Sequence, residues 1–296
     1  MSEASKRIDD ATEQVLLEIV HQHGTPAYAF DVERLRAQAN RLRVELPDAI
    51  EIFYSLKANA SLGICDVFAE SGLGADVASA GELATAVEAG FPASRLFVAG
   101  PCKSRETWSM LRELPDAVIS IDSPSELSWL ASEGLPNPVV LRLRPDYESC
   151  AVVTAGAGSR FGVPQDELPK CRTILDSGRI NLIGFHVFAG SQVLEASGVI
   201  DHLRRGLDLS LQASDALSFT PEFLNLGGGF GIPYGIGQAE LALAAVGTEL
   251  ESIIARARGA RVALELGRYL VAQAGWYLTS VLAQQQTLYS INPHRV

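Results

Sequence analysis

The segment LFVAGPCKSRETWSMLRELPDAVISIDSPSELSWLASEGLPNPVVLRL, residues 96–143, contains the pattern from which the fold class follows. It holds three short apolar runs, Leu96–Val98, Val118–Ile121 and Val139–Leu143, and each run predicts a strand. The two longer segments between these runs have helix-like patterns. Apolar strands that alternate with amphipathic helices are typical of a parallel sheet with crossover helices. The stretch therefore predicts an α/β fold.

The same alternation extends in both directions from this stretch. Strands are predicted at Ile52–Ser55, Ala75–Val77, Leu96–Val98, Val118–Ile121, Val139–Leu143, Leu182–Phe188, Phe223–Leu226 and Val262–Glu265. Helices are predicted near residues 61–71, 81–90, 104–113, 123–134, 165–177, 196–215 and 238–257. Eight strands within about 215 residues predict a closed (β/α)8 barrel of the TIM type, whose usual length is about 250 residues. A doubly wound open sheet shows similar alternation, and the number of strands favours the barrel.

Three parts are expected along the chain. Residues 1–35 hold a predicted helix at Asp9–His21 and an extended segment at Ala27–Phe30. Residues 36–282 form the predicted barrel. Residues 283–296 show no periodicity, so we expect a short tail there rather than a second domain.

Composition excludes several classes of protein. Of the 296 residues, 47% are hydrophobic, which suffices for a large core and excludes disorder for most of the chain. Lys and Arg number 24 against 35 Asp and Glu, a net charge of −11, so no nucleic-acid partner is expected. Apolar runs fall short of the roughly 20 residues that a membrane span needs, so no membrane partner is expected. The N-terminus lacks the apolar core of a signal peptide.

The four cysteines are widely spaced. Cys65, Cys102, Cys150 and Cys171 form no C-x-x-C pair. We therefore expect neither a disulfide framework nor a metal site, and a reduced cytoplasmic location fits this usage best.

Lys57 lies in the segment FYSLKAN, residues 53–59, at the C-terminal end of the first predicted barrel strand. Barrel enzymes place catalytic groups at this end of the strands. Desolvation there would lower the pKa of the lysine and favour Schiff-base formation. A surface lysine at a strand end is the alternative.

A glycine-rich loop follows the seventh strand in the segment LNLGGGFG, residues 224–231. Gly227, Gly228 and Gly229 allow the backbone to approach an anion, and their N–H groups can bind a phosphate. The loops after strands seven and eight form the usual phosphate site of such barrels. The spacing matches neither G-x-G-x-x-G nor a Walker motif, so this loop is not predicted to be a nucleotide-binding motif. A plain flexible turn is the alternative.

The eighth strand ends in the segment LELGRY, residues 264–269. Glu265 and Arg268 are expected to face the barrel mouth together. An arginine near the glycine loop is a natural partner for a phosphate. A structural ion pair is the alternative.

Two further segments carry polar residues at strand ends. In GFHVFAGSQ, residues 184–192, His186 and Phe188 share one face of the strand, and the hydroxyl of Ser191 can donate to a phosphate. In GADVASAGEL, residues 74–83, Asp76 lies near the second strand. The alternatives are a satisfied core histidine and a turn-forming aspartate.

Together the five segments resemble one family. Y-S-L-K-A-N, D-V-A-S-x-G-E-L, G-x-H-x-x-x-G-S-Q, N-L-G-G-G-F and E-x-G-R occur in the order found in the fold-type III decarboxylases that depend on pyridoxal 5'-phosphate. This group includes the ornithine, arginine and diaminopimelate decarboxylases. The resemblance runs from about Thr25 to Val281 and implies a barrel of the alanine racemase-like class.

The resemblance also implies roles for individual residues. Lys57 resembles the lysine that holds pyridoxal phosphate as a Schiff base, and Glu265 the carboxylate that keeps the pyridine nitrogen protonated. The ring then accepts the electron pair left when the carboxylate departs as carbon dioxide. Lys57 and His186 are the expected catalytic residues. The expected cofactor-binding residues are Lys57, Asp76, Arg142, His186, Phe188, Ser191, Gly227, Gly228, Gly229, Glu265, Gly267 and Arg268.

The sequence departs from the family pattern at two places. Phe188 occupies the position of a second histidine that stacks on the cofactor ring, and an aromatic side chain can still stack there. With this change the sequence is similar to a branch of the family in which some relatives act on amino acids tethered to carrier proteins. The family continues into a C-terminal β-domain that supplies a catalytic cysteine, and this chain stops fifteen residues after Val281. We therefore expect the β-domain to be missing or truncated.

The resemblance implies decarboxylation of a small-molecule amino acid through a Lys57 Schiff base. The substrate would be similar to diaminopimelate or ornithine, or would be linked to a carrier protein. A cytoplasmic homodimer is expected if the β-domain is present. Two alternatives remain open: a non-catalytic barrel that binds pyridoxal phosphate, with or without a regulatory role, and an inactive decarboxylase remnant.

Overall fold

The computed structural model describes residues 8–147, 153–154, 160–235 and 237–283. Cys150 and all but the first residue of the predicted tail lie outside these ranges. The chain divides into two compact units, residues 32–273 and a unit formed by residues 1–31 with 274–296.

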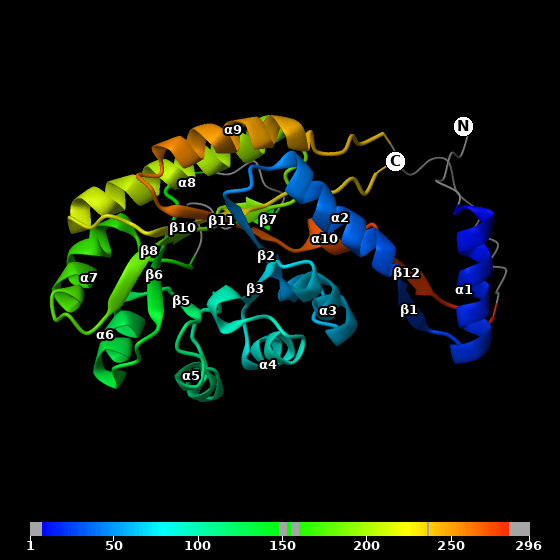
Figure 1. The fold of residues 1–296 in the computed structure, drawn as a ribbon, viewed down its shortest axis with the longest axis horizontal. Helices are drawn as coiled ribbons and strands as arrows, with labels where there is room; N and C mark the ends of the chain where they lie inside the picture. The colour runs from blue at the N-terminus through cyan, green and yellow to red at the C-terminus, as the bar shows by residue number, and fades with distance from the viewer. Residues whose placement is uncertain (1–7, 148–152, 155–159, 236, 284–296) are drawn as a thin grey trace, which may run out of the picture. The chain divides into compact units, whose positions relative to one another are not determined.

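The larger unit is built around a closed barrel of parallel strands (Figure 1). The barrel strands in the described residues are β2 (Ile50–Ser55), β3 (Gly74–Val77), β4 (Leu96–Val98), β5 (Val118–Ile121), β6 (Pro138–Leu143), β8 (Asn181–Val187), β10 (Phe223–Gly228) and β11 (Arg261–Leu266). They pair in the order β10-β11-β2-β3-β4-β5-β6-β8. The prediction of a closed barrel is confirmed, and the open-sheet alternative is wrong.

Helices connect the strands and cover the barrel. They are α2 (Val32–Glu45), α3 (Leu62–Glu70), α4 (Ala80–Glu88), α5 (Arg105–Arg112), α6 (Pro124–Glu133), α7 (Leu168–Leu175), α8 (Ala196–Leu217), α9 (Leu243–Arg256) and the short α10 (Arg268–Val271). The last two long helices, α8 and α9, pack side by side (Figure 1). A small antiparallel pair of strands, β7 (Val153–Thr154) and β9 (Gly190–Ser191), accompanies the barrel.

The structure differs from the predicted helices at two places. Helix α2 was not predicted, because its composition is mostly polar and its buried stripe is only Leu35, Ala39 and Leu42. Helix α9 begins at Leu243 rather than near residue 238. The side chain of Gln238 accepts hydrogen bonds from the backbone N–H groups of Tyr234 and Gly235, and this turn precedes the helix.

The barrel interior has an apolar layer below a polar one. The rings of Phe53, Phe97 and Phe223 pack with centroids 5.9–6.3 Å apart. Further along the strands, the ring of His186 packs edge-on against Phe97 at 5.2 Å. Beyond this aromatic layer the barrel interior contains buried polar strand residues, and Glu265 is one of them.

The smaller unit contains α1 (Asp10–His23), β1 (Ala27–Phe30) and β12 (Gly275–Leu278). The predicted N-terminal helix and extended segment are both present. The two strands pair antiparallel, with Ala27 opposite Leu278. Strand β12 falls in the range that the domain prediction assigned to the barrel, but it pairs with β1. Within the described part of the chain, no helix combines the length and apolar character needed to cross a membrane.

Candidate active site

A cavity of about 290 Å³ opens at the C-terminal ends of the barrel strands. This is the end at which barrel enzymes build their active sites. The cavity is lined by Ser55, Lys57, Ala58, Phe188, Ser191, Gln192, Gly229, Phe230, Glu265, Leu266, Gly267 and Arg268. Seven of the predicted site residues therefore meet at one cavity. The others, namely Asp76, Arg142, His186, Gly227 and Gly228, lie beside it or beneath it.

Lys57 lies in a short 3-10 turn directly after β2 and reaches toward β3. Its Nζ is 3.4 Å from Oδ2 of Asp76, a carboxylate that is almost fully buried and also accepts a 2.7 Å hydrogen bond from Ser55 Oγ. The attraction of Asp76 is the largest cause that raises the pKa of Lys57 above its usual value. The expected lowering of this pKa is therefore wrong, because a paired carboxylate outweighs burial.

Glu265 lies in β11 with its carboxylate on the floor of the cavity. Its Oε1 accepts a 2.8 Å hydrogen bond from Asn225 Nδ2 and lies 3.2 Å from His186 Nε2. Burial is the main cause that raises the pKa of Glu265, to about 8. The raised pKa favours the protonated form of this carboxyl group, which can share its proton with a basic atom in the cavity.

His186 is buried beneath Glu265 in β8. Its Nδ1 is hydrogen-bonded to Ser120 Oγ at 2.9 Å. Its Nε2 has no aligned hydrogen-bond partner in the described residues, although Glu265 lies nearby. Burial is the largest cause that holds the pKa of His186 well below its usual value, so the ring is neutral. The side chain of His186 is only 1% exposed, so this geometry gives it no direct contact with a ligand in the cavity.

The glycine loop forms one wall of the cavity, and the space around it requires glycine. Gly227 and Gly229 have positive φ angles of 67° and 74°. A Cβ atom on Gly228 would lie 2.4 Å from the backbone oxygen of Glu265, and one on Gly229 would lie 2.6 Å from that of Gly190. The alternative of a plain flexible turn does not fit these close backbone contacts.

Arg268 provides a cation beside the glycine loop. Its Nη1 donates to Gln192 Oε1 at 3.4 Å, and its guanidinium lies 5.8 Å from the ring centre of Tyr234. Gln192 also accepts a hydrogen bond from the backbone N–H of Ile232. Ser191 lines the same end of the cavity. This end therefore offers the donors that an anion needs.

Phe188 presents an aromatic face to Lys57. The Lys57 Nζ lies 5.1 Å from the centre of its ring. Phe188 also packs against the glycine loop, since a Cβ on Gly227 would lie 3.1 Å from its ring. A flat aromatic ligand in this cavity could stack on Phe188.

Arg142 lies outside the cavity on β6, opposite His186 in the barrel register. Its Nη1 is 3.5 Å from Asp122 Oδ1, and its guanidinium lies 5.3 Å from the ring centre of Phe161. Arg142 thus connects the polar layer of the barrel with the segment that follows β6.

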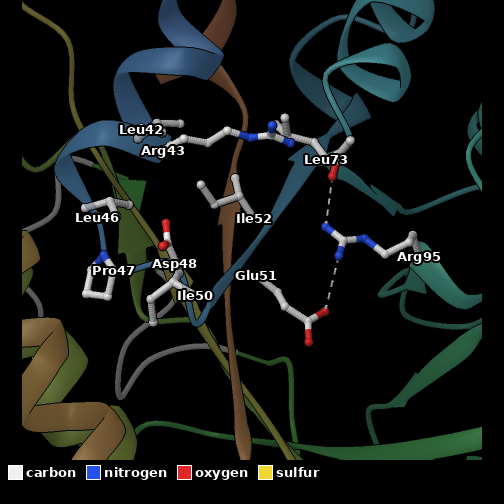
Figure 2. Close-up of a pocket in the computed structure, with 11 residues that line it drawn as sticks. Leu42, Arg43, Leu46, Pro47, Asp48, Ile50, Glu51, Ile52, Leu73 and Arg95 are labelled. Carbon is white, nitrogen blue, oxygen red and sulfur yellow. Dashed lines mark hydrogen bonds and ion pairs between the residues drawn. The ribbon is translucent and has the colours of Figure 1, made fainter.

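A second cavity of about 310 Å³ lies at the opposite end of the barrel, where β2, β3 and β4 begin. Figure 2 shows Arg95 between a backbone carbonyl and the carboxylate of Glu51. Arg95 donates to Gly72 O at 3.1 Å and lies 3.9 Å from Glu51. These side chains pair with the protein itself, and the cavity holds none of the predicted site residues.

Several residues of the site were missed at the level of sequence, among them three that orient predicted residues. Ser120, Gln192 and Asn225 orient His186, Arg268 and Glu265 through hydrogen bonds. Gln192 and Asn225 stand within the quoted motifs, which was the available signal. Ser120 lies in the middle of an apolar strand and had no such signal. Among the described residues, no cluster of His, Cys, Asp and Glu could hold a metal ion.

Comparison with known proteins gives a consistent family. Residues 32–272 match the family model described as pyridoxal-dependent decarboxylase, pyridoxal binding domain. The L-glutamyl-[BtrI acyl-carrier protein] decarboxylase of Niallia circulans is 32% identical over 270 residues, which cover 87% of this chain and 63% of that protein. The diaminopimelate decarboxylase of Bacillus subtilis (strain 168) is 32% identical over 292 residues, covering 91% of this chain and 66% of that protein.

Solved structures agree with this similarity. The diaminopimelate decarboxylase from M. jannaschii in co-complex with L-lysine superimposes with a TM-score of 0.79 at 26% identity. The match covers 88% of this chain and 64% of the other. The chain thus spans less than two thirds of the length of these relatives.

Proposed function

The chain belongs to the pyridoxal-dependent decarboxylases, and from this membership we propose that it decarboxylates an amino acid with pyridoxal phosphate held at Lys57. The observation that carries the proposal is one cavity at the barrel mouth. It joins the amine of Lys57, the carboxyl of Glu265 and a close-packed glycine loop. The relatives act on a free amino acid or on one linked to a carrier protein, and both substrate types are candidates here.

The residues of the cavity fit the cofactor. The glycine loop forms one wall of the cavity, where its backbone N–H groups could hold a phosphate, and Ser191 and Arg268 stand beside it. Glu265 would share a proton with the ring nitrogen, and Phe188 would stack on the ring. When bound, pyridoxal phosphate supplies a ring that accepts the electron pair left by the departing carboxylate.

The protein's own groups prepare this site in three ways. Asp76 holds a proton on Nζ of Lys57, so that the amine is a charged partner for anions until it reacts. Asn225 orients the carboxyl of Glu265 through a direct hydrogen bond. Ser120 holds the ring of His186 beneath the same carboxyl, so we assign His186 a positioning role.

The test is the visible absorption band that appears when a protein lysine binds pyridoxal phosphate. We expect the band with the wild-type chain and its loss in Lys57→Ala. Lys170→Ala is the matched control, because Lys170 is exposed on α7 and pairs only with Glu167 in the described structure. A wild-type chain without the band, or a Lys57→Ala variant that keeps it, would contradict the cofactor assignment.

Catalysis is tested separately by release of carbon dioxide. Diaminopimelate, ornithine and a carrier-linked glutamate are offered to the wild-type chain and to Lys57→Ala. Carbon dioxide from one of them with wild type alone supports a decarboxylase. A chain that binds pyridoxal phosphate and releases no carbon dioxide from any amino acid would support the binding-only alternative.

A cytoplasmic location and a homodimer complete the proposal. All three cysteines in the described residues, Cys65, Cys102 and Cys171, are free thiols, in keeping with a reducing compartment. Sedimentation of the purified chain tests the dimer, and fractionation of the cells that make it tests the location.

A further inference from the structure

A separate cavity of about 580 Å³ opens at the same end of the barrel as the candidate active site. It lies over the ends of β4 and β5, between helices α5 and α6 and the segment that follows β6. Its lining includes Lys103, Arg105, Trp108, Asp122, Trp129 and Arg160. None of them belongs to the cavity that contains Lys57.

The walls of this cavity are aromatic. Trp108 and Trp129 pack with ring centroids 4.5 Å apart. Trp108 is almost fully buried, whereas Trp129 and Phe161 are 37% and 46% exposed. Large apolar side chains that remain exposed around a hollow are typical of a ligand site.

The floor of the cavity is polar, but its charges are already paired. The buried Lys103 lies 3.1 Å from Glu126, and Asp122 lies 3.5 Å from Arg142. The Oδ1 atom of Asp122 is buried and has no aligned hydrogen-bond donor in the described structure. A neutral N–H group of a ligand could donate to it without leaving a charge unpaired.

Two unpaired cations stand at the rim. Arg105 and Arg160 are exposed, and no ion pair joins either of them to an acid within the described ranges. Arg144 positions Arg160 by donating hydrogen bonds to the backbone carbonyls of Arg160 and Phe161. In a protein with a net charge of −11, this pair of guanidinium groups is a local site for an anion.

The cavity adjoins the active site through Arg142. This side chain pairs with Asp122 on the cavity floor and lies against the ring of Phe161 on its wall. Its register partner on the neighbouring strand β8 is His186, which lies under Glu265. The floor of this cavity is therefore linked through Arg142 to the residues beneath the candidate active site.

We propose that this cavity binds the phosphopantetheine arm of a substrate in which the amino acid is carried as a thioester. The arm combines a phosphate, an elongated chain and amide N–H groups. These match the two arginines at the rim, the aromatic walls and the Asp122 oxygen. The charged end of a free amino acid would instead need unpaired partners on the floor, where the carboxylates are already paired. The proposal rests on the function proposed above and specifies its substrate class.

Binding of free 4'-phosphopantetheine tests the proposal without catalysis. Calorimetry measures the affinity. Tryptophan fluorescence in a Trp276→Phe background reports on Trp108 and Trp129 alone, since the chain has three tryptophans. We expect binding that weakens at least about tenfold when Arg105 and Arg160 are both changed to Ala, because charged hydrogen bonds are lost. Lys at both positions should restore part of the affinity, and Arg179→Ala, an exposed control, should leave it unchanged.

The source of the arm is identified with three further probes. Pantetheine without its phosphate should bind as weakly as the double variant. A carrier protein that bears the arm, and coenzyme A, show which form binds more tightly. Equal affinity for pantetheine and phosphopantetheine, or an unchanged affinity in the double variant, would overturn the proposal.

The two proposals fail in different ways. The absorption band of bound pyridoxal phosphate depends on Lys57 and is measured without any arm. A chain that shows this band and does not bind phosphopantetheine refutes the substrate class alone. A chain that binds phosphopantetheine at Arg105 and Arg160 but shows no band refutes the decarboxylase instead.

Discussion

Replacing Asp76 with asparagine is predicted to lower the pKa of Lys57, because it removes the charge that is the largest cause of the raised pKa. The two charged atoms lie 3.4 Å apart, so their attraction is about 1 kcal/mol in water and about 5 kcal/mol at an effective dielectric constant of about 20. The Lys57 side chain is 52% exposed, and solvent screening therefore keeps the interaction near the lower value.

The assay follows the rate at which Lys57 captures pyridoxal phosphate as the pH is raised from about 7 to about 11. Only the unprotonated amine reacts, so the midpoint of this profile reports the pKa of Lys57. We expect the midpoint of Asp76→Asn to lie lower than that of wild type, with faster capture at pH values below it.

Ser55→Ala is the matched control for this experiment. It removes the 2.7 Å hydrogen bond to Asp76 and leaves the negative charge in place, so the midpoint should stay near that of wild type. A midpoint in Asp76→Asn that equals the wild-type value would refute the assignment of the ion pair. An equal shift in Ser55→Ala would attribute the effect to the shape of the site rather than to charge.

Three further predictions concern stability and cofactor affinity. His202 is buried and neutral, because burial lowers its pKa to about 4, so its contribution to stability is full above about pH 6.5 and is lost as the pH falls toward 4. Urea unfolding should therefore lose up to about 3 kcal/mol over this interval, and His202→Gln should flatten the loss. Gly229→Ala should weaken pyridoxal phosphate binding, measured by titration, because its Cβ would meet a backbone oxygen at 2.6 Å. Gly237→Ala shares the positive φ but has open space, so equal losses of affinity in both variants would count against the steric reason. Phe97→Ala should destabilise the barrel by about 3–5 kcal/mol in the same unfolding assay, and a loss below about 1 kcal/mol would contradict its place in the core.

The barrel strands could be predicted from sequence because each is apolar and bounded by turn residues. Helix α2 could not, since only three of its residues form a buried stripe and most of the others are polar. The stripe has the spacing of a helix, but three apolar residues are too few to indicate an amphipathic helix in so polar a segment. The start of α9 was also misplaced, because the turn closed by Gln238 depends on a side-chain contact.

The site was predicted where a motif carries its residues together. Lys57, Glu265 and Arg268 belong to such segments, and all three line one cavity. Ser120 became visible only through the barrel register, which brings β5 toward His186. The direction of the Lys57 pKa was wrong because the sequence does not give the distance to Asp76.

The order of the strands has a consequence for how the chain acquires its cofactor site. Strand β2, the earliest barrel strand to be synthesised, pairs with β11, the latest. Lys57 follows the first of these strands, and Glu265 and Arg268 lie at the end of the second. The two sides of the cavity therefore meet along a seam that closes only when nearly the whole barrel has been made. A cofactor that contacts both sides would hold this seam together, and would slow the opening of the folded barrel along it.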